Sequence, residues 1–195
     1  MRKIKICCFG DIHYYGVRRD LEKLARNIEN SCSEVDVITI VGDLTSSGRL
    51  DYVEEVLSVV KEIVSHVPVL VIPGNHDGDL KRILPEKIKL HSSKGIGLDD
   101  IYLIHGHTWP EKEFLKAKIL IMAHIHPHIE FKDKLGYRWT EPVWIKTVLD
   151  KEKIAKKFGE VKKLPRIIII PAFNRLVGGM CVNKETEEKD FISPV

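Results

Sequence analysis

The sequence contains no glutamine, although 30% of its 195 residues are charged. A chain rich in Lys and Glu but poor in amide side chains is typical of hyperthermophile proteins, so we expect a thermophilic source. Basic and acidic residues nearly balance, at 31 against 28, and the formal charge of +3 indicates no particular partner. The length suits one domain with a substantial core, and we predict a single domain over residues 1–195.

Long apolar runs and paired cysteine motifs are also missing. No run approaches the roughly 18 apolar residues of a membrane span, and the basic start leads directly into an apolar stretch, so we expect neither a membrane segment nor a signal peptide. The four cysteines, at positions 7, 8, 32 and 181, lack the spacing of a metal site. Cys7 and Cys8 lie in an apolar run and are expected to be small buried hydrophobic residues. A reduced, cytoplasmic protein is the simplest interpretation.

The first 77 residues alternate between two hydrophobic patterns. Apolar stretches at 4–9, 35–41 and 67–72 predict buried strands, and apolar residues at helical spacing over 21–28 and 50–64 predict two helices. This order predicts a βαβαβ unit with parallel strands. Beyond it we predict strands at 101–104 and 118–122 and short helices at 80–84 and 111–116. After residue 128, strand candidates at 129–131, 137–139, 143–148, 166–170 and 176–177 surround a basic helix near 150–158, which suits a second, largely antiparallel sheet packed on the first.

Residues that can bind a metal follow each of the five clearest strands. The motifs are, in chain order, Asp11-Ile12-His13, Gly42-Asp43, Gly74-Asn75-His76-Asp77, His105-Gly106-His107 and His124-Ile125-His126. Strand ends of a parallel α/β sheet meet at one edge, so these loops are expected to converge. About seven N and O ligands are too many for one tetrahedral ion and predict two adjacent divalent ions. Imidazole with carboxylate favours Mn, Fe, Zn, Co or Ni over Ca or Mg, and of these we expect Mn.

The predicted pair of ions also indicates a type of reaction. Held roughly 3.5–4 Å apart, they generate hydroxide at neutral pH and hold the attacking and leaving oxygens of a displacement at phosphorus. One carboxylate must bridge the ions, and Asp43 is our candidate. One imidazole must protonate the leaving alkoxide, and His76 is our candidate. Asp77 is expected to orient His76 and raise its pKa.

The motifs, in their order and spacing over residues 1–127, resemble those of calcineurin-like metallophosphoesterases. His105-Gly106-His107 and His126-Pro127, with the later segments 171–174 and 178–179, are similar to the small Icc-like branch, whose bacterial members are associated with DNA ligase. The resemblance implies an α/β fold, a four-layer α/β/β/α sandwich of two mixed sheets flanked by helices. In one departure, Ala123 stands where the last motif usually begins with Gly, which matters only if φ there is positive.

The resemblance also implies a role for each motif residue. Asp11, His13 and His126 would bind the first ion, and Asn75, His105 and His124 would bind the second, with Asp43 between them. His76 would donate the proton and, with Asn75, contact the phosphate. His107 either touches the substrate or hydrogen-bonds a ligand.

The expected substrate is a phosphodiester, either at nucleic-acid ends or in a nucleotide. The motifs do not separate diesters from monoesters, so a phosphomonoesterase is an alternative. A non-catalytic binding scaffold is another, although the intact ligand set and His76 favour an enzyme. The lysines at 151–163 either meet a phosphate backbone or form a solvated helix face. The ligase resemblance implies a DNA-repair partner, and apolar late strands with exposed tryptophans would allow a homodimer.

Overall fold

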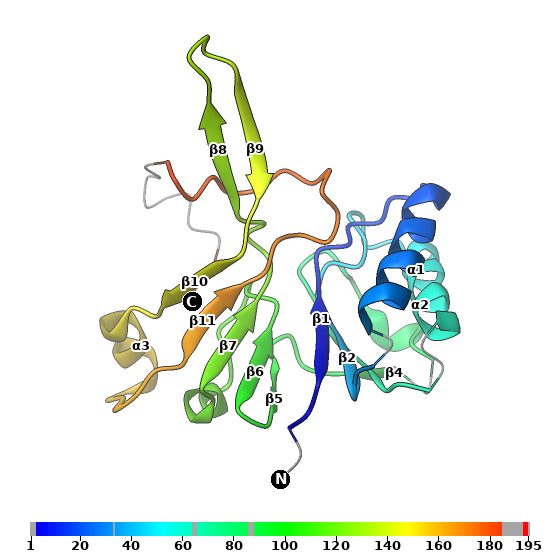
Figure 1. Cartoon of the computed structure of the whole chain (residues 1–195). Helices are drawn as coiled ribbons and strands as arrows, with labels where there is room; N and C mark the ends of the chain where they lie inside the picture. The colour runs from blue at the N-terminus through cyan, green and yellow to red at the C-terminus, as the bar shows by residue number, and fades with distance from the viewer. Residues whose placement is uncertain (1–2, 33, 64–65, 86–87, 185–192, 195) are drawn as a thin grey trace.

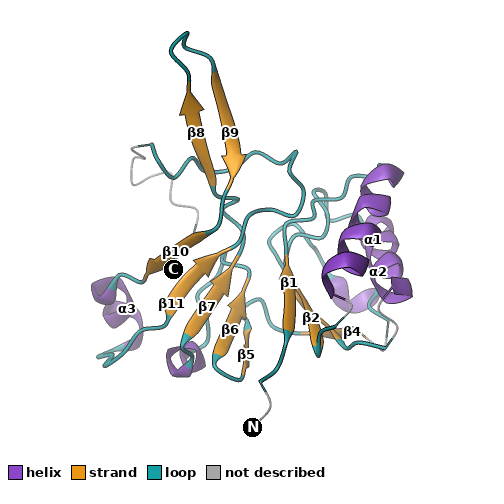
Figure 2. Ribbon diagram, viewed as in Figure 1, coloured by secondary structure: helices purple, strands orange, loops and turns teal. Residues whose placement is uncertain are grey.

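A computed structural model describes residues 3–32, 34–63, 66–85, 88–184 and 193–194. Two β-sheets pack face to face, with helices on the outer side of each (Figures 1 and 2). Helices α1 (Arg18–Cys32) and α2 (Leu50–Ile63) cover the first sheet, and α3 (Lys151–Phe158) lies outside the second. The expected four-layer α/β/β/α arrangement is confirmed. None of the helices in these ranges is long and apolar enough to cross a membrane.

The first sheet contains β1 (Ile6–Phe9), β2 (Val37–Val41), β3 (Val69–Ile72) and β4 (Ile88–Leu90) in that order. All of its neighbouring strands are parallel, and the predicted βαβαβ unit is confirmed. Every residue of β2 and β3 is buried, because helices cover one face of the sheet and the second sheet covers the other. The carboxyl ends of β1, β2 and β3 therefore lie side by side.

The second sheet has the order β10 (Ile145–Val148), β11 (Arg166–Ile169), β7 (Ile119–Met122), β6 (Ile101–Ile104) and β5 (Ile96–Leu98). Its three central strands are parallel, and only the edge strands β5 and β10 are antiparallel to their neighbours. The expectation of a largely antiparallel sheet is wrong here. The chain between β7 and β11 is long enough for a crossover, which returns β11 parallel to β7.

The strands β8 (His128–Lys132) and β9 (Arg138–Pro142) form an antiparallel hairpin that projects away from both sheets (Figure 1). We call residues 128–142 the arm. The strand expected at 176–177 is wrong, because this segment is a turn in which Asn174 accepts hydrogen bonds from the N–H groups of Leu176 and Val177. The two short helices are 3₁₀ turns at Leu80–Arg82 and Lys112–Lys116.

Three apolar clusters separate the four layers. One lies between the first sheet and α1 and α2, and it includes Leu24, Ile28 and Leu57. A second lies between the two sheets around Val41, Ile72 and Leu103, and a third lies between the second sheet and α3. Burial of these side chains stabilises the stacking of the two sheets. Their carboxyl ends are consequently held at one edge of the sandwich.

One cysteine expectation is corrected by the structure. Cys7 in β1 and Cys32 at the end of α1 form a disulfide, with Cα atoms 5.7 Å apart, so the expected fully reduced chain is wrong for this pair. The two residues meet because α1 folds back along β1, and isolated cysteines in a sequence do not reveal such a contact. Cys8 and Cys181 are free.

Candidate metal centre

The loops after β1, β2, β3, β6 and β7 carry all of the predicted ligands, and the structure brings these side chains together. They form two groups that share Asp43: Asp11, His13, Asp43 and His126 in the first, and Asp43, His105 and His124 in the second. Within each group the ligand atoms lie within 4.8 Å of one another. Asn75 lies beside the second group, since its Oδ1 is 3.2 Å from Nε2 of His105.

The first group is compact enough to surround one cation. Nε2 of His13 is 3.2 Å from Nε2 of His126 and 3.5 Å from Oδ2 of Asp43. Nε2 of His126 is also 3.3 Å from Oδ1 of Asp11. Metal–nitrogen bonds of about 2.0–2.1 Å place neighbouring ligands of one ion roughly 3 Å apart. These spacings are therefore those of ligands around a common ion.

The second group is organised around the same carboxylate. Nε2 of His105 lies 3.3 Å from Oδ2 of Asp43, the oxygen that also faces His13. Because this one oxygen faces an imidazole from each group, Asp43 occupies the position that a bridging ligand requires. The geometry agrees with the role expected for Asp43 from its place between the other motifs.

Backbone carbonyls fix which nitrogen each histidine presents to the centre. Nδ1 of His105 lies 2.9 Å from the carbonyl oxygen of Val41, and Nδ1 of His126 lies 2.9 Å from that of Gly178. A carbonyl only accepts, so each Nδ1 must donate its proton, and Nε2 is the nitrogen that faces the ligand group and offers a lone pair once it is deprotonated. This is the usual support for histidines that bind metals.

The donor set fits divalent cations. Asp11 Oδ1 is buried and has no hydrogen-bond partner among the described residues, whereas its Oδ2 accepts from the N–H of His124 at 3.0 Å. A buried carboxylate oxygen without a partner is costly, and a cation would satisfy it. The converging atoms are nitrogen and oxygen, without a thiolate, which suits Mn, Fe, Zn, Co or Ni.

The charge of Asp43 is secured by its neighbours. Burial alone would raise the pKa of this carboxyl, but the hydrogen bond and charge of His105 and the N–H of His76 hold the pKa at about 2. That N–H donates to Oδ1 of Asp43 at 2.9 Å, which leaves Oδ2 for the ligand groups. Asp43 is consequently ionised at neutral pH.

The ligand loops have an unusual backbone. Five predicted ligands, Asp11, His13, Asp43, His124 and His126, have φ between +44° and +73°. Such left-handed conformations cost of order 1 kcal/mol or more each and persist only where the surroundings enforce them, most often at functional sites. The positive φ falls on His124 and not on Ala123, so alanine fits at the position where the resembling motif usually has glycine.

Two glycines make room for the ligands. A Cβ added at Gly42, whose φ is +79°, would overlap the ring of His105. A Cβ added at Gly74 would overlap the carboxylate of Asp43. The glycines of the Gly-Asp and Gly-Asn-His-Asp motifs are therefore required by the close approach of the ligand side chains.

His76 lies at the exposed side of the two groups. Its ring centroid is 5.3 Å from that of His13, and its Nδ1 lies 3.2 Å from the carbonyl oxygen of Ser46. The carbonyl makes Nδ1 the donor, which leaves Nε2 free to exchange a proton. The side chain is exposed, so it can reach a substrate.

Asp77 does not contact His76 as we expected. Its buried carboxylate accepts hydrogen bonds from the backbone N–H groups of Asp43, Leu44 and Gly74, at 2.9, 2.6 and 2.7 Å. The expected orientation of His76 by Asp77 is wrong, because the side chain turns inward to join the loops after β2 and β3. Burial raises the pKa of Asp77 to about 6.

His107 lies beside the second group. Its ring centroid is 5.2 Å from that of His105 and 6.1 Å from that of His124. Burial, and then the neighbouring histidines, lower the pKa of His107 to about 4, so the ring is neutral at pH 7. Its Nδ1 is buried without a hydrogen-bond partner in the described ranges, so no bond to a ligand is seen there.

Sequence reasoning missed two supports of the site. The Oγ of Ser46 lies 3.4 Å from Nδ1 of His13, and the Ser46 carbonyl holds His76. The loop after β11 also braces the first motif, because Phe173 and Asn174 donate backbone hydrogen bonds to Gly10 and Asp11. Ser46 stands three residues after Asp43, which is the only signal in the sequence, and backbone carbonyls leave none.

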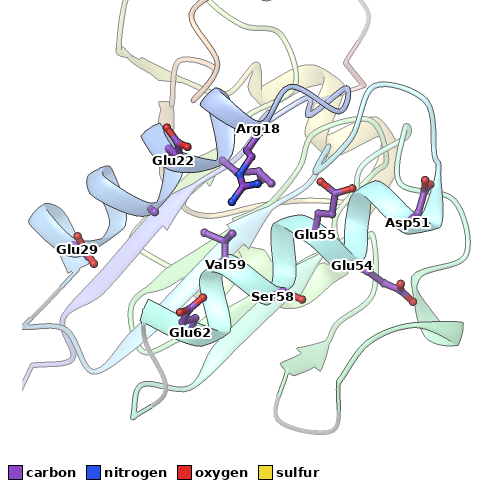
Figure 3. A pocket seen from close by; sticks show the side chains of 11 residues that line it. Arg18, Glu22, Glu29, Asp51, Glu54, Glu55, Ser58, Val59 and Glu62 are labelled. Atoms are coloured by element: carbon purple, nitrogen blue, oxygen red, sulfur yellow. The ribbon is translucent and has the colours of Figure 1, made fainter.

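A surface groove between α1 and α2 lies apart from this centre (Figure 3). Its walls are largely acidic, with Glu22 and Glu29 on α1 and Glu54 and Glu62 on α2. None of the predicted ligands lines it. The charge of this groove would repel an anionic ligand.

Comparison with known proteins gives the family. Residues 4–161 match the calcineurin-like phosphoesterases, and the chain belongs to this family. A curated relative from Fibrobacter succinogenes, named probable cyclic nucleotide phosphodiesterase, is 33% identical over 66 residues. That match spans 33% of this chain and only 25% of the relative.

A solved structure shares the fold. The Pseudomonas putida nuclease MPE superposes with a TM-score of 0.59 and 18% identity, over 93% of this chain and 80% of that one. At this identity the likeness establishes the fold alone. The family match and the shared fold therefore agree, and the structure adds candidate sites for divalent metals.

Proposed function

We propose that this protein is a dinuclear-metal phosphodiesterase. The observation that carries the proposal is the pair of ligand groups that share one oxygen of Asp43, with His76 exposed beside them. Asp11, His13, Asp43 and His126 would hold one ion, and Asp43, Asn75, His105 and His124 the other. Bound there, two divalent ions would supply an activated water molecule and stabilisation of the charge that develops at phosphorus.

The chain's own residues supply the remaining steps. His76, held through Nδ1 by Ser46, would donate a proton from Nε2 to the leaving alkoxide. Asn75 and His107 flank the second group and would contact the phosphate. Asp77 would act indirectly, because its hydrogen bonds hold the loops that carry Asp43 and His76 together.

The substrate is proposed to be a nucleic-acid end or a nucleotide diester. A phosphodiesterase relative and a nuclease of the same fold support both choices. The lysines of α3 are exposed, but this helix lies away from the ligand loops (Figure 1). Manganese as the native metal, a thermophilic source and a DNA-repair partner stay predictions.

The direct test is hydrolysis of bis-p-nitrophenyl phosphate by protein that has been stripped with EDTA and reloaded with Mn, Co, Ni, Zn or Fe. We expect activity with at least one metal, near two ions per chain by elemental analysis, and loss of activity when EDTA is added. A chain that binds fewer than one ion and turns over no ester would instead support the binding scaffold. Faster hydrolysis of p-nitrophenyl phosphate than of the diester would support a phosphomonoesterase.

Salt dependence separates the two substrate classes. Each neutralised phosphate of a nucleic acid releases counterions, so a nuclease should lose affinity for oligonucleotides steeply between about 50 and 200 mM salt. Fluorescence anisotropy with a labelled single strand measures this. Affinity that is flat over the range would favour a nucleotide-sized diester.

A further inference from the structure

The arm is the part of the molecule with the least support from its own chain. Its strands pair with each other and with neither sheet. Among the described residues, the base of β8 is held by hydrogen bonds between His128 and residues 180–182 and between Glu130 and Asn183, and by an ion pair between Glu130 and Lys184. The outer half projects beyond the body (Figures 1 and 2). A two-stranded hairpin is marginally stable in water unless another surface packs on it.

One face of the arm is aromatic. Phe131 and Trp139 are direct cross-strand partners, with ring centroids 5.3 Å apart and planes at 21°. Tyr137 continues the row, 6.1 Å from Trp139 and at 22°. The three residues are 42%, 40% and 68% exposed. The side chains therefore form a row of stacked, partly exposed rings, an aromatic platform on one face of the arm.

The tip of the arm is an ordered turn. Oδ1 of Asp133 accepts from the N–H groups of Leu135 and Tyr137 at 2.9 and 2.8 Å, and the backbone closes between Asp133 and Tyr137. These bonds fix the loop and leave Leu135 95% exposed. An aliphatic side chain presented in this way, next to an aromatic row, is typical of a protein contact.

The charges of the arm do not suit a nucleic acid. Residues 128–142 contain three basic and three acidic side chains, and Arg138 is already paired with Glu130. A binding face for single strands combines aromatic platforms with a positive groove. The neutral arm offers the first feature without the second, which favours a protein partner.

Two charged residues of the arm, Glu141 and Lys134, would lie opposite each other if two copies of the chain packed their arms head to tail. Glu141 shares the aromatic face with Trp139 near the base of the arm, because alternate residues of a strand face the same side. Lys134 lies at the tip, and within the described residues neither it nor Glu141 has an ion-pair partner. An antiparallel arrangement about a two-fold axis would place the tip of each arm beside the base of the other.

We infer that the arm is a dimerisation surface, on which two copies of this chain pack Phe131, Leu135, Tyr137 and Trp139 against the same residues of the partner. Two-fold symmetry requires such self-complementarity, and offset stacking of flat rings supplies it. The four side chains expose on the order of 500 Å², most of the roughly 800 Å² that each partner contributes to a specific interface. This inference is independent of the proposed catalysis.

Light scattering coupled to size exclusion tests the inference on the full chain. The wild-type protein should elute with twice the chain mass of 22.3 kDa. Replacing Leu135 and Tyr137 by Asp should weaken dimerisation by about 30-fold or more, since a few large buried side chains carry most of the binding free energy of an interface and a charge cannot replace them there. The control is Leu176→Asp, at a residue that is 73% exposed outside the arm, and it should leave the dimer intact.

A charge exchange tests the arrangement without touching the aromatic row. Glu141→Lys and Lys134→Glu should each weaken the dimer, and the double variant should restore it, because like charges are destabilising at close contact. A wild-type monomer at all accessible concentrations would overturn the inference, as would a dimer indifferent to the Asp variants. Salt-sensitive binding of a single-stranded oligonucleotide by a monomer, lost in those variants, would assign the platform to nucleic acid instead.

Discussion

The metal centre and the arm are neighbours in the chain but are held in opposite ways. His126 is a predicted ligand, and β8 begins two residues later at His128. At the centre, ligands are mostly buried, have a left-handed backbone and form hydrogen bonds with several loops. In the arm, large apolar side chains are exposed and hydrogen bonds are mostly local.

This difference in burial and hydrogen bonding indicates different roles for the two regions. Unfavourable backbone conformations persist only where many contacts enforce them, and the centre is surrounded by both sheets. Exposed apolar surface, by contrast, is tolerated where a partner covers it. The first region gathers its ligand side chains within one chain, whereas the second leaves large apolar side chains exposed to solvent. The predictions below test this contrast, from the largest expected effect to the smallest.

Asp43→Asn should have the largest effect. Removing the charge that both ligand groups share should lower metal-dependent activity by about 10³-fold, more than the 10–100-fold typical of groups that only support ligands. Metal content should fall as well. Asp99→Asn is the matched control, because Asp99 also has a positive φ, of +50°, but lies outside the centre. If both variants retained full activity, Asp43 would not be the shared ligand.

His76→Asn should separate catalysis from metal binding. For a diester with an alkoxide leaving group we expect a loss of about 10²–10⁴-fold in kcat, the range of a general acid, with unchanged metal content. For bis-p-nitrophenyl phosphate, whose leaving group needs no proton, the loss should be much smaller. Equal losses with the two substrates would instead indicate that His76 mainly positions the phosphate.

Gly42→Ala and Gly136→Ala compare the two regions directly. Both glycines have a positive φ, +79° and +91°, but a Cβ at Gly42 overlaps His105 whereas a Cβ at Gly136 meets nothing within 4 Å. Gly136→Ala should lower the free energy of unfolding by about 1 kcal/mol, from backbone strain alone. Gly42→Ala should lower it by about 3 kcal/mol, since an overlap adds to the strain. Equal losses of unfolding free energy for the two variants, measured by urea unfolding, would mean that the ring of His105 moves aside easily to make room for the added Cβ.

Leu135→Ser should have the smallest effect on folding. The residue is 95% exposed, so the free energy of unfolding at concentrations where the chain is monomeric should change by less than about 0.5 kcal/mol. The same variant should weaken the dimer measurably. A large loss of stability in the monomer would show that Leu135 packs within its own chain.

The sequence predicted correctly those features that depend on residue type and spacing alone. Apolar periodicity located β1, β2 and β3, and α1 and α2 between them, and the motif spacing located the ligands that the structure gathers. It missed β4 and β5, because strands of three residues carry too little alternation to recognise. Parallel pairing of β11 with β7 was also missed, since it depends on the path of the intervening chain.

The sequence predicted which side chains come together at the centre better than it predicted their hydrogen-bond partners. A carboxylate next to a histidine in sequence suggested a pair, yet Asp77 bonds to three backbone N–H groups and His76 to the carbonyl of Ser46. Both sets of hydrogen bonds depend on how the loops after β2 and β3 approach each other in space. The contact of Cys7 with Cys32 has the same origin.

The left-handed backbone at five ligands limits how this centre can change. Asp, Asn and His are the residues other than glycine that most readily adopt positive φ, and the ligands at those five positions are Asp and His. A substitution by Cys or Glu, which would shift the preference toward softer or harder ions, would be opposed by the loop before any ion is bound. The backbone therefore narrows the range of metals that this chain can come to use by mutation.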